Sequence, residues 1–352
     1  MTPSLRTSLL TLLNAVGPSG YEHEAVDAWC ELAASVGDVQ RDRLGGAHCI
    51  VNPGGSPRVL LVGHIDEIGF VVKHIDEQGM LWLAPIGGWD PSIPTGQRVR
   101  IRTRAGHVPG VFGTKARHMM SEDEMTKAPK LKNLWVDIGA SSGEEARTLV
   151  RIGDPLVLEG PPIELAGGRI ASRALDNRLG ALAALEGARR AGAEPGLAAE
   201  VIAVAAVREE ITYAGAATAA YKLDPDVAIA IDVTHATDVP IDGIERAVGE
   251  HPLGSGPTIS RGAAMHEGVA ARLIELAEGQ AIPFSLEADG ISSWTDAEAV
   301  HAVRGGVPCG LLGIPLRGMH SPCETADLKD LENTAELAAR FCRSLVPGQE
   351  WR

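Results

Sequence analysis

Histidine and acidic side chains follow apolar runs, or begin predicted helices, at five places along this chain. Side chains of these types bind divalent metal ions, and a carboxylate beside such ions can act as a general base. Ligands of open α/β sheets bind in the crevice beyond the carboxyl ends of the strands, so the five places can converge there. The residues are His64 with Asp66, Asp176, Glu209 with Glu210, Asp232 and His320.

Two histidines and three carboxylates form a coherent ligand set for two ions such as Zn²⁺, Co²⁺ or Mn²⁺. In such a centre one carboxylate bridges the ions, which lie roughly 3.5–4 Å apart and share a water. Another carboxylate must stay off the metals to take the proton of that water. The adjacent Glu209 and Glu210 supply one group of each kind, and Asp66 can hold the imidazole of His64 from behind.

Each of these segments is a weak signal by itself. An isolated His-x-Asp sequence is more often a solvated turn, an isolated Glu-Glu pair is usually surface charge, and a histidine before Ser-Pro is most often a loop residue. The order of all five places, each at a strand end or a helix start, makes an accidental arrangement improbable.

The composition is that of a soluble globular protein and argues against several kinds of partner. Apolar residues make up 45% and charged residues 22% of the 352 residues. A net charge of −14 argues against a nucleic-acid backbone or an anionic membrane surface as partner. No apolar run approaches the roughly 18 residues that span a bilayer, and the chain does not begin like a signal peptide. Five cysteines without a Cys-x-x-Cys pair indicate reduced thiols, so we expect a cytoplasmic protein.

The elements that must position these residues alternate between helices and apolar strands at both ends of the chain. Continuous apolar strands indicate a sheet that is buried on both faces. We therefore expect an α/β fold with a mixed, largely parallel sheet sandwiched by helices. Helices are predicted over residues 3–16, 22–35, 177–190, 214–221, 264–277 and 327–345, and strands over residues 58–63, 69–75, 201–207, 227–231 and 311–314.

The segment between these two parts has a different character. Short β-like pieces such as residues 99–103 alternate with Gly and Pro turns and show little helical periodicity, which is typical of a small β-barrel or sandwich. The sequence therefore predicts one catalytic domain, residues 1–69 and 166–352, interrupted by an inserted β-rich domain, residues 70–165.

Several segments resemble the glutamyl-aminopeptidase or TET family of metallopeptidases. The resemblance covers nearly the whole chain, including residues 137–140 (DIGA) inside the insertion. The other matching segments are residues 63–70 (GHIDEIGF), 174–178 (ALDNR), 209–210 (EE), 232–234 (DVT), 295–297 (TDA) and 319–324 (MHSPCE).

The resemblance implies an activity, an assembly and a role for each residue. It implies an aminopeptidase that acts on peptides, in which the insertion forms a dimer contact and dimers build a hollow particle of twelve subunits. It also implies a cis peptide bond after Asp176, which would bridge the two ions, while Glu209 is the general base and Asp66 orients His64. The implied metal ligands are His64, Asp176, Glu210, Asp232 and His320.

The chain departs from the family pattern near its predicted site. Arg208 stands where Gln is usual, residues 211–213 replace a usual Val-Gly run, and Gly318 replaces a common Tyr. No departure removes a ligand, but each can reshape the substrate pocket. The preferred N-terminal residue, the physiological metal and any contact of Arg208 or His118 with the substrate stay open.

Three alternatives have different chemical requirements. A carboxypeptidase, deacylase or dipeptidase of the related clan has a similar ligand order, but here the insertion lies early, between Asp66 and Asp176, as in the TET family. An endoglucanase-like glycosidase would need two free carboxylates flanking a sugar. A non-enzymatic oligomeric scaffold would be expected to lack the base or a ligand, and this sequence has lost neither.

Overall fold

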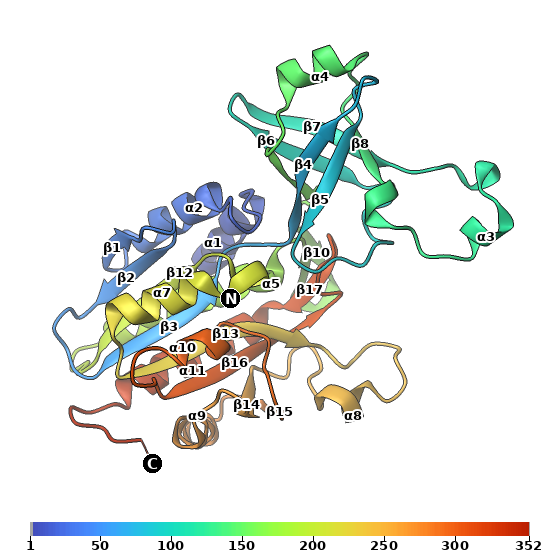
Figure 1. The fold of residues 1–352 in the computed structure, drawn as a ribbon. Coiled ribbons are helices and arrows are strands. Elements are labelled where there is room, and N and C mark those ends of the chain that lie inside the picture. The colour runs from blue at the N-terminus through green and yellow to red at the C-terminus, as the bar shows by residue number, and fades with distance from the viewer. Residues whose placement is uncertain (1–2, 352) are drawn as a thin grey trace.

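A computed structural model describes residues 3–351, which form an α/β domain with a β-barrel beside it (Figure 1). Residues 1, 2 and 352, which the predicted domain ranges include, lie outside the described residues. The chain leaves the α/β domain after β3 (Arg58–His64) and returns to it at β10 (Ile163–Leu165). The barrel is therefore inserted between two parts of the α/β domain.

Eleven strands form the mixed sheet of the α/β domain. Its four central strands, β12, β3, β13 and β16, run parallel, so their carboxyl ends meet at one edge. The register places Ala206 beside His64, and Asp232 beside Gly313. The strand order is β1 (Asp38–Arg41), β2 (Ala47–Val51), β12 (Glu200–Ala206), β3, β13 (Val227–His235), β16 (Cys309–Arg317), β17 (Glu324–Asp327), β11 (Arg169–Ser172) and β10, with β14 (Thr258–Gly262) and β15 (Ser285–Asp289) added at β16.

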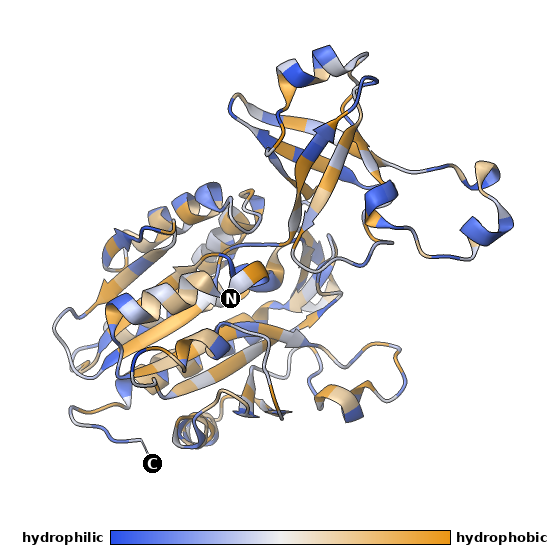
Figure 2. Cartoon of the chain, in the orientation of Figure 1, coloured by the Kyte–Doolittle hydropathy of each residue, from blue (hydrophilic) through white to orange (hydrophobic). Residues whose placement is uncertain are grey.

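Helices cover both faces of this sheet, which is why its central strands are apolar along their length. Alternate residues of a strand point to opposite faces. In β3, Val59 and Leu61 pack on one side while Leu60 and Val62 pack on the other. Figure 2 shows mostly hydrophobic residues along these strands, whereas hydrophilic and hydrophobic residues alternate along the helices. The first face packs against α1 (Pro3–Asn14), α2 (His23–Ala33), α5 (Leu175–Gly192), α9 (Glu267–Gly279) and α11 (Leu328–Arg343), and the second against α7 (Ala214–Leu223) and α10 (Ala297–Val300).

Six antiparallel strands close the barrel, so the barrel has no free edge. Its core is built from buried side chains such as Phe70, Ile101, Val136 and Leu156. A segment with α3 (Glu122–Met125) projects away from the barrel (Figure 1). Helix α4 (Gly143–Leu149) lies at the end of the barrel that is farther from the α/β domain. The strands are β4 (Gly69–Ile75), β5 (Leu81–Ile86), β8 (Trp135–Asp137), β7 (Gly106–Gly113), β6 (Arg98–Thr103) and β9 (Pro155–Leu158).

One predicted boundary next to the site is wrong, and one short helix there was not predicted. The strand predicted to end at residue 231 continues as β13 to His235, because its pairing with β16 extends that far. Asp232 therefore lies inside a strand. Glu209 and Glu210 begin a short helix, α6 (Glu209–Thr212), after the end of β12. Among residues 3–351, no helix combines the length and the apolar character needed to cross a membrane.

Candidate metal centre

The predicted ligands and the predicted base converge at the carboxyl edge of the sheet. They line one cavity of about 450 Å³, whereas Asp66 lies behind it. Asp176 enters the cavity from the first turn of α5, and its peptide bond with Asn177 is cis, as the family resemblance implies. His320 follows β16 in a left-handed backbone conformation, with φ of 60°. The lining residues that the sequence predicted are His64, Asp176, Glu209, Glu210, Asp232 and His320.

Asp176 faces a different histidine with each of its carboxylate oxygens. Its Oδ1 lies 3.2 Å from Nε2 of His64, and its Oδ2 lies 3.5 Å from Nε2 of His320. Asp232 completes the first group, with Oδ1 3.6 Å from Nε2 of His64. Glu210 completes the second, with Oε2 3.4 Å from Nε2 of His320. Within each group one donor atom per residue lies within 4.8 Å of the others, and Asp176 belongs to both groups.

Glu209 lies beside these groups without belonging to either. Its Oε2 is 3.7 Å from Nε2 of His64, and the side chain is buried. Burial raises the pKa of Glu209 to about 11, and repulsion from Asp232 and Asp296 adds to this effect against the attraction of His64. In the protein without bound cations, burial therefore favours the protonated form of Glu209.

The donor set fits divalent cations. Within residues 3–351, no Lys or Arg lines the cavity to balance its carboxylates. Burial raises the pKa of Glu210 to about 7, and its Oε1 is buried without a hydrogen-bond partner among the described residues. Burial opposes the charged form of His320, but the carboxylates of Glu210 and Asp176 outweigh it and raise the His320 pKa to about 9. Bound cations would relieve this crowding of negative charge, and the mixed imidazole and carboxylate donors suit borderline ions.

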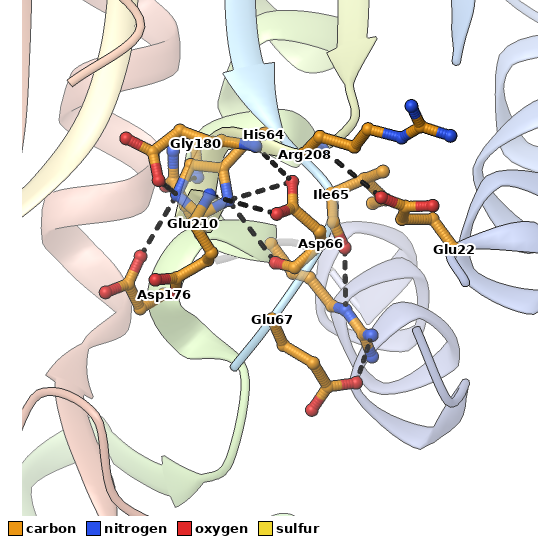
Figure 3. Close-up of polar contacts among 12 residues, drawn as sticks. Glu22, His64, Ile65, Asp66, Glu67, Asp176, Gly180, Arg208 and Glu210 are labelled. Carbon is orange, nitrogen blue, oxygen red and sulfur yellow. Dashed lines mark hydrogen bonds and ion pairs between the residues drawn. The ribbon is translucent and has the colours of Figure 1, made fainter. Parts of the chain in front are cut away.

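Asp66 connects the end of β3 to the start of α6. Its Oδ1 accepts a hydrogen bond from the backbone N–H of Glu209, and its Oδ2 accepts one from that of Glu210, both at 3.1 Å. Nδ1 of His64 lies 3.3 Å from the backbone oxygen of Asp66 and 3.6 Å from its Oδ1 (Figure 3). Asp66 is thus behind His64, where the sequence placed it. The sequence analysis did not predict the two hydrogen bonds from the backbone of Glu209 and Glu210 to the Asp66 carboxylate.

Two further buried glutamates fix the backbone of the site. Glu324 accepts hydrogen bonds from the backbone N–H groups of Asp176 and His320, both at 3.0 Å, so it holds two residues of the second group. Glu67 accepts a hydrogen bond of 2.7 Å from Arg178 and thereby ties the segment after β3 to α5. Both glutamates lie within the matching segments, but the sequence analysis gave them no role.

Other residues near the site also lacked an assignment. Asp296 is buried, and neither of its carboxylate oxygens has a partner among the described residues. Glu22 accepts a hydrogen bond of 3.2 Å from the backbone N–H of Arg208. Glu22 and Asp176 lie on opposite sides of Asp66 (Figure 3). Burial and repulsion from Asp66 raise the pKa of Glu22 to about 7. His118 and Arg208 do not line the cavity in this chain, and His118 is exposed.

Comparisons with known proteins show which family this chain resembles. The family model described as M42 glutamyl aminopeptidase matches residues 46–337. The chain is 35% identical to the lysyl aminopeptidase of Pyrococcus furiosus over 343 residues, which are 96% of each chain. The TET aminopeptidase of a marine sediment archaeon of the Thaumarchaeota superimposes with a TM-score of 0.91, at 34% identity and 97% coverage of both chains.

A second solved structure is that of the Pyrococcus horikoshii TET1 peptidase, which can assemble into a tetrahedron or a large octahedral shell. It has a TM-score of 0.86 and 28% identity, and the match covers 97% of this chain and 100% of that one. The family match spans every residue of the cavity that the sequence predicted. The chain therefore belongs to the M42 glutamyl aminopeptidase family and is a metallo-aminopeptidase.

Proposed function

We propose that the chain releases the N-terminal residue of peptides with two divalent metal ions and with Glu209 as general base. The orientation of Asp176 carries this proposal, because its two carboxylate oxygens face His64 and His320 separately. A carboxylate in this position would bridge two ions, as in other two-metal hydrolases. Asp232 would complete the ligands of one ion, and Glu210 those of the other.

The roles of the two glutamates follow from where their carboxylates lie. When bound, the ions would polarise the scissile carbonyl and lower the pKa of a water molecule. Glu209 lies outside both donor groups, and nearby positive charge would lower its pKa from about 11 toward the range of a useful base. Its carboxylate then accepts the proton of the attacking water and passes it to the leaving amine. Asp66 fixes the positions of Glu209 and Glu210, because its carboxylate accepts hydrogen bonds from their backbone N–H groups.

The donor types favour Zn²⁺, Co²⁺ or Mn²⁺ as the bound ions. Imidazole and carboxylate together suit these ions, whereas a site for Ca²⁺ or Mg²⁺ would be built from oxygen donors. All five cysteines are free thiols, and none of them lines the cavity. Because a reducing compartment keeps thiols in this state, we place the protein in the cytoplasm.

We also propose that the chain forms dimers through its β-rich insertion, residues 70–165, and that the dimers build a dodecamer. The tetrahedral assembly of the Pyrococcus horikoshii relative supports this proposal. Enclosing the cavities in such a particle would restrict the substrates to unfolded peptides. The net charge of −14 is consistent with peptide substrates and with the expected lack of nucleic-acid partners.

A panel of aminoacyl p-nitroanilides and short peptides tests the proposed activity. The protein is stripped of metal, reconstituted separately with Zn²⁺, Co²⁺ and Mn²⁺, and assayed on each substrate with a free or an acetylated N-terminus. We expect stepwise release from free N-termini only, and no activity without metal. Cleavage of acetylated peptides, release of C-terminal residues, or no hydrolysis with any of the three ions would overturn the proposal.

A further inference from the structure

The cavity continues past the candidate metal ligands to a second pair of carboxylates on β15, Glu287 and Asp289. The lining of the cavity also includes the apolar residues Val248 and Leu311. Among residues 3–351, no Lys, Arg or His is close enough to form an ion pair with either carboxylate. This end of the cavity therefore combines apolar residues with two carboxylates that form no ion pair within residues 3–351.

Two threonines hold the Glu287 side chain in place. Its Oε1 accepts a hydrogen bond of 2.8 Å from Oγ1 of Thr234, and its Oε2 accepts one of 3.1 Å from Oγ1 of Thr258. Thr258 is fully buried, and Thr234 is nearly so. Each carboxylate oxygen has a second acceptor position, so Glu287 can still bind a cationic donor.

Gly313 makes this arrangement possible. It lies on β16 between Asp232 of β13 and Thr258 of β14. A Cβ atom at this position would lie 2.4 Å from Oγ1 of Thr258 and 3.2 Å from Cβ of Thr234. The missing side chain lets the two threonines approach each other and leaves the floor of the cavity open.

Two further observations show repulsion between carboxylates and an unpaired hydroxyl at this end of the cavity, among residues 3–351. Burial raises the pKa of Asp289 to about 6, and repulsion from Glu287 and Glu298 adds to the effect. Ser260 pairs with Glu287 in the register of β14 and β15, and its hydroxyl is buried without a partner among the described residues. A cationic ligand at Glu287 would be favoured by this local excess of negative charge.

The distance from the metal ligands to Glu287 matches the length of a basic side chain. Thr234 lies two residues beyond Asp232 on the same face of β13, which corresponds to about 7 Å. The five bonds from Cα to Nζ of an extended lysine, each about 1.5 Å long, span roughly 6 Å. A substrate whose scissile bond lies at the metal ligands can therefore bring a lysine ammonium close to Glu287.

We infer that Glu287, with Asp289 at its side, makes this aminopeptidase select peptides that begin with Lys or Arg. The inference rests on the proposed function, because it assigns this end of the cavity to the side chain of the N-terminal residue. The methylene groups pack against Val248 and Leu311, while the charged end binds Glu287. Glu287 is a specificity-determining residue in this account, and the reaction itself does not involve it.

The α-ammonium group of the substrate is the other cation that Glu287 could bind. That nitrogen is one bond from Cα, beside the scissile carbonyl, so it must stay near the metal ligands. Glu287 lies one side-chain length away from them. The two possibilities also differ in outcome, because every unblocked substrate carries an α-ammonium, whereas only basic substrates carry a second cation.

The test compares kcat/KM for lysyl and norleucyl p-nitroanilides, which differ by the terminal ammonium, on the metal-loaded protein. We expect the wild type to favour lysine by about 10-fold or more, the range of a partly desolvated charged hydrogen bond. Glu287→Gln should reduce the Lys-to-norleucine ratio by about 10-fold or more. The matched control Glu278→Gln, on the exposed face of α9, should keep the wild-type ratio.

Two outcomes would overturn the inference while leaving the proposed function intact. The wild type cleaves norleucine as well as lysine, or Glu287→Gln leaves the Lys-to-norleucine ratio unchanged. The second outcome includes an equal fall of both rates, which α-ammonium binding or a structural role would cause. If Glu287→Gln does not fold, the wild-type ratio and the ratio for Asp289→Asn, which should also fall, decide the question. Failure of every unblocked anilide with all three metals would instead refute the proposed function.

Discussion

Replacing Asp66 by Asn tests whether this carboxylate holds the two glutamates of the site. Asp66 accepts one backbone N–H from Glu209 and one from Glu210, each at 3.1 Å, and its exposed fraction is 0%. An amide has one acceptor oxygen, so Asp66→Asn can keep only one of these hydrogen bonds. Its NH₂ group would then face the other backbone N–H, and two donors would meet in a buried place.

The expected loss follows from the burial of this contact. A buried donor left without an acceptor costs about 1–3 kcal/mol, and no solvent reaches Asp66 to reduce that cost. We therefore expect the free energy of unfolding of the metal-free protein to fall by about 1–3 kcal/mol. The start of α6 should also shift, and misplacing a catalytic group by about 1 Å can lower turnover by about 10²-fold.

Urea unfolding of the metal-free protein measures the first effect, and steady-state kinetics of the metal-loaded protein measures the second. Asp242→Asn, at an exposed position far along the chain, is the matched control and should change neither quantity. An Asp66→Asn protein with wild-type stability and wild-type turnover would show that the two hydrogen bonds do not position the glutamates.

Three other predictions follow from the same structure. Asp176→Ala should lose both metal ions, measured as metal content per chain, because this carboxylate belongs to both donor groups; a folded variant with two tightly bound ions would contradict its bridging role. Light scattering at micromolar concentration should show an oligomer and, on the proposed assembly, a mass twelve times that of the chain; a fully active monomer would refute it. Burial raises the pKa of Asp330 from 3.8 to about 7, so the folded state binds this proton more tightly. This contribution to stability is complete below about pH 4 and is lost as the pH rises to about 7. Between about pH 4 and pH 7, the urea midpoint of the wild type should therefore fall relative to that of Asp330→Asn. If the urea midpoints of the two proteins changed with pH in parallel, the raised pKa of Asp330 would be refuted.

The residues that line the candidate site could be picked out because each of them adjoins an element with a strong periodic signal. The apolar runs before His64 and Asp232 form parallel strands, and parallel strands bring their carboxyl ends together. Burial of both sheet faces by helices then follows from the same runs. The cis peptide after Asp176 was implied only by the family resemblance, because no local pattern indicates it.

The contacts that hold the candidate ligands could not be predicted in the same way. Glu324 reaches the backbone of Asp176 across 148 positions, and Asp66 reaches Glu209 across 143. A local pattern contains no information about such pairings. The acidic end of the cavity was also missed, since β14 and β15 are short strands that carry polar residues among apolar ones. Glu287 acquires its environment only when β13, β16 and β14 place Thr234 and Thr258 beside it.

The central claim is that Glu209 transfers the proton while its neighbour Glu210 binds a metal ion. The most direct measurement compares Glu209→Gln with Glu210→Gln, recording metal content and turnover for each. Our account predicts that Glu209→Gln binds two ions per chain while its turnover falls at least about 10²-fold, and that Glu210→Gln binds metal more weakly and regains activity in excess metal. Exchanged phenotypes, or wild-type turnover in Glu209→Gln, would contradict the account.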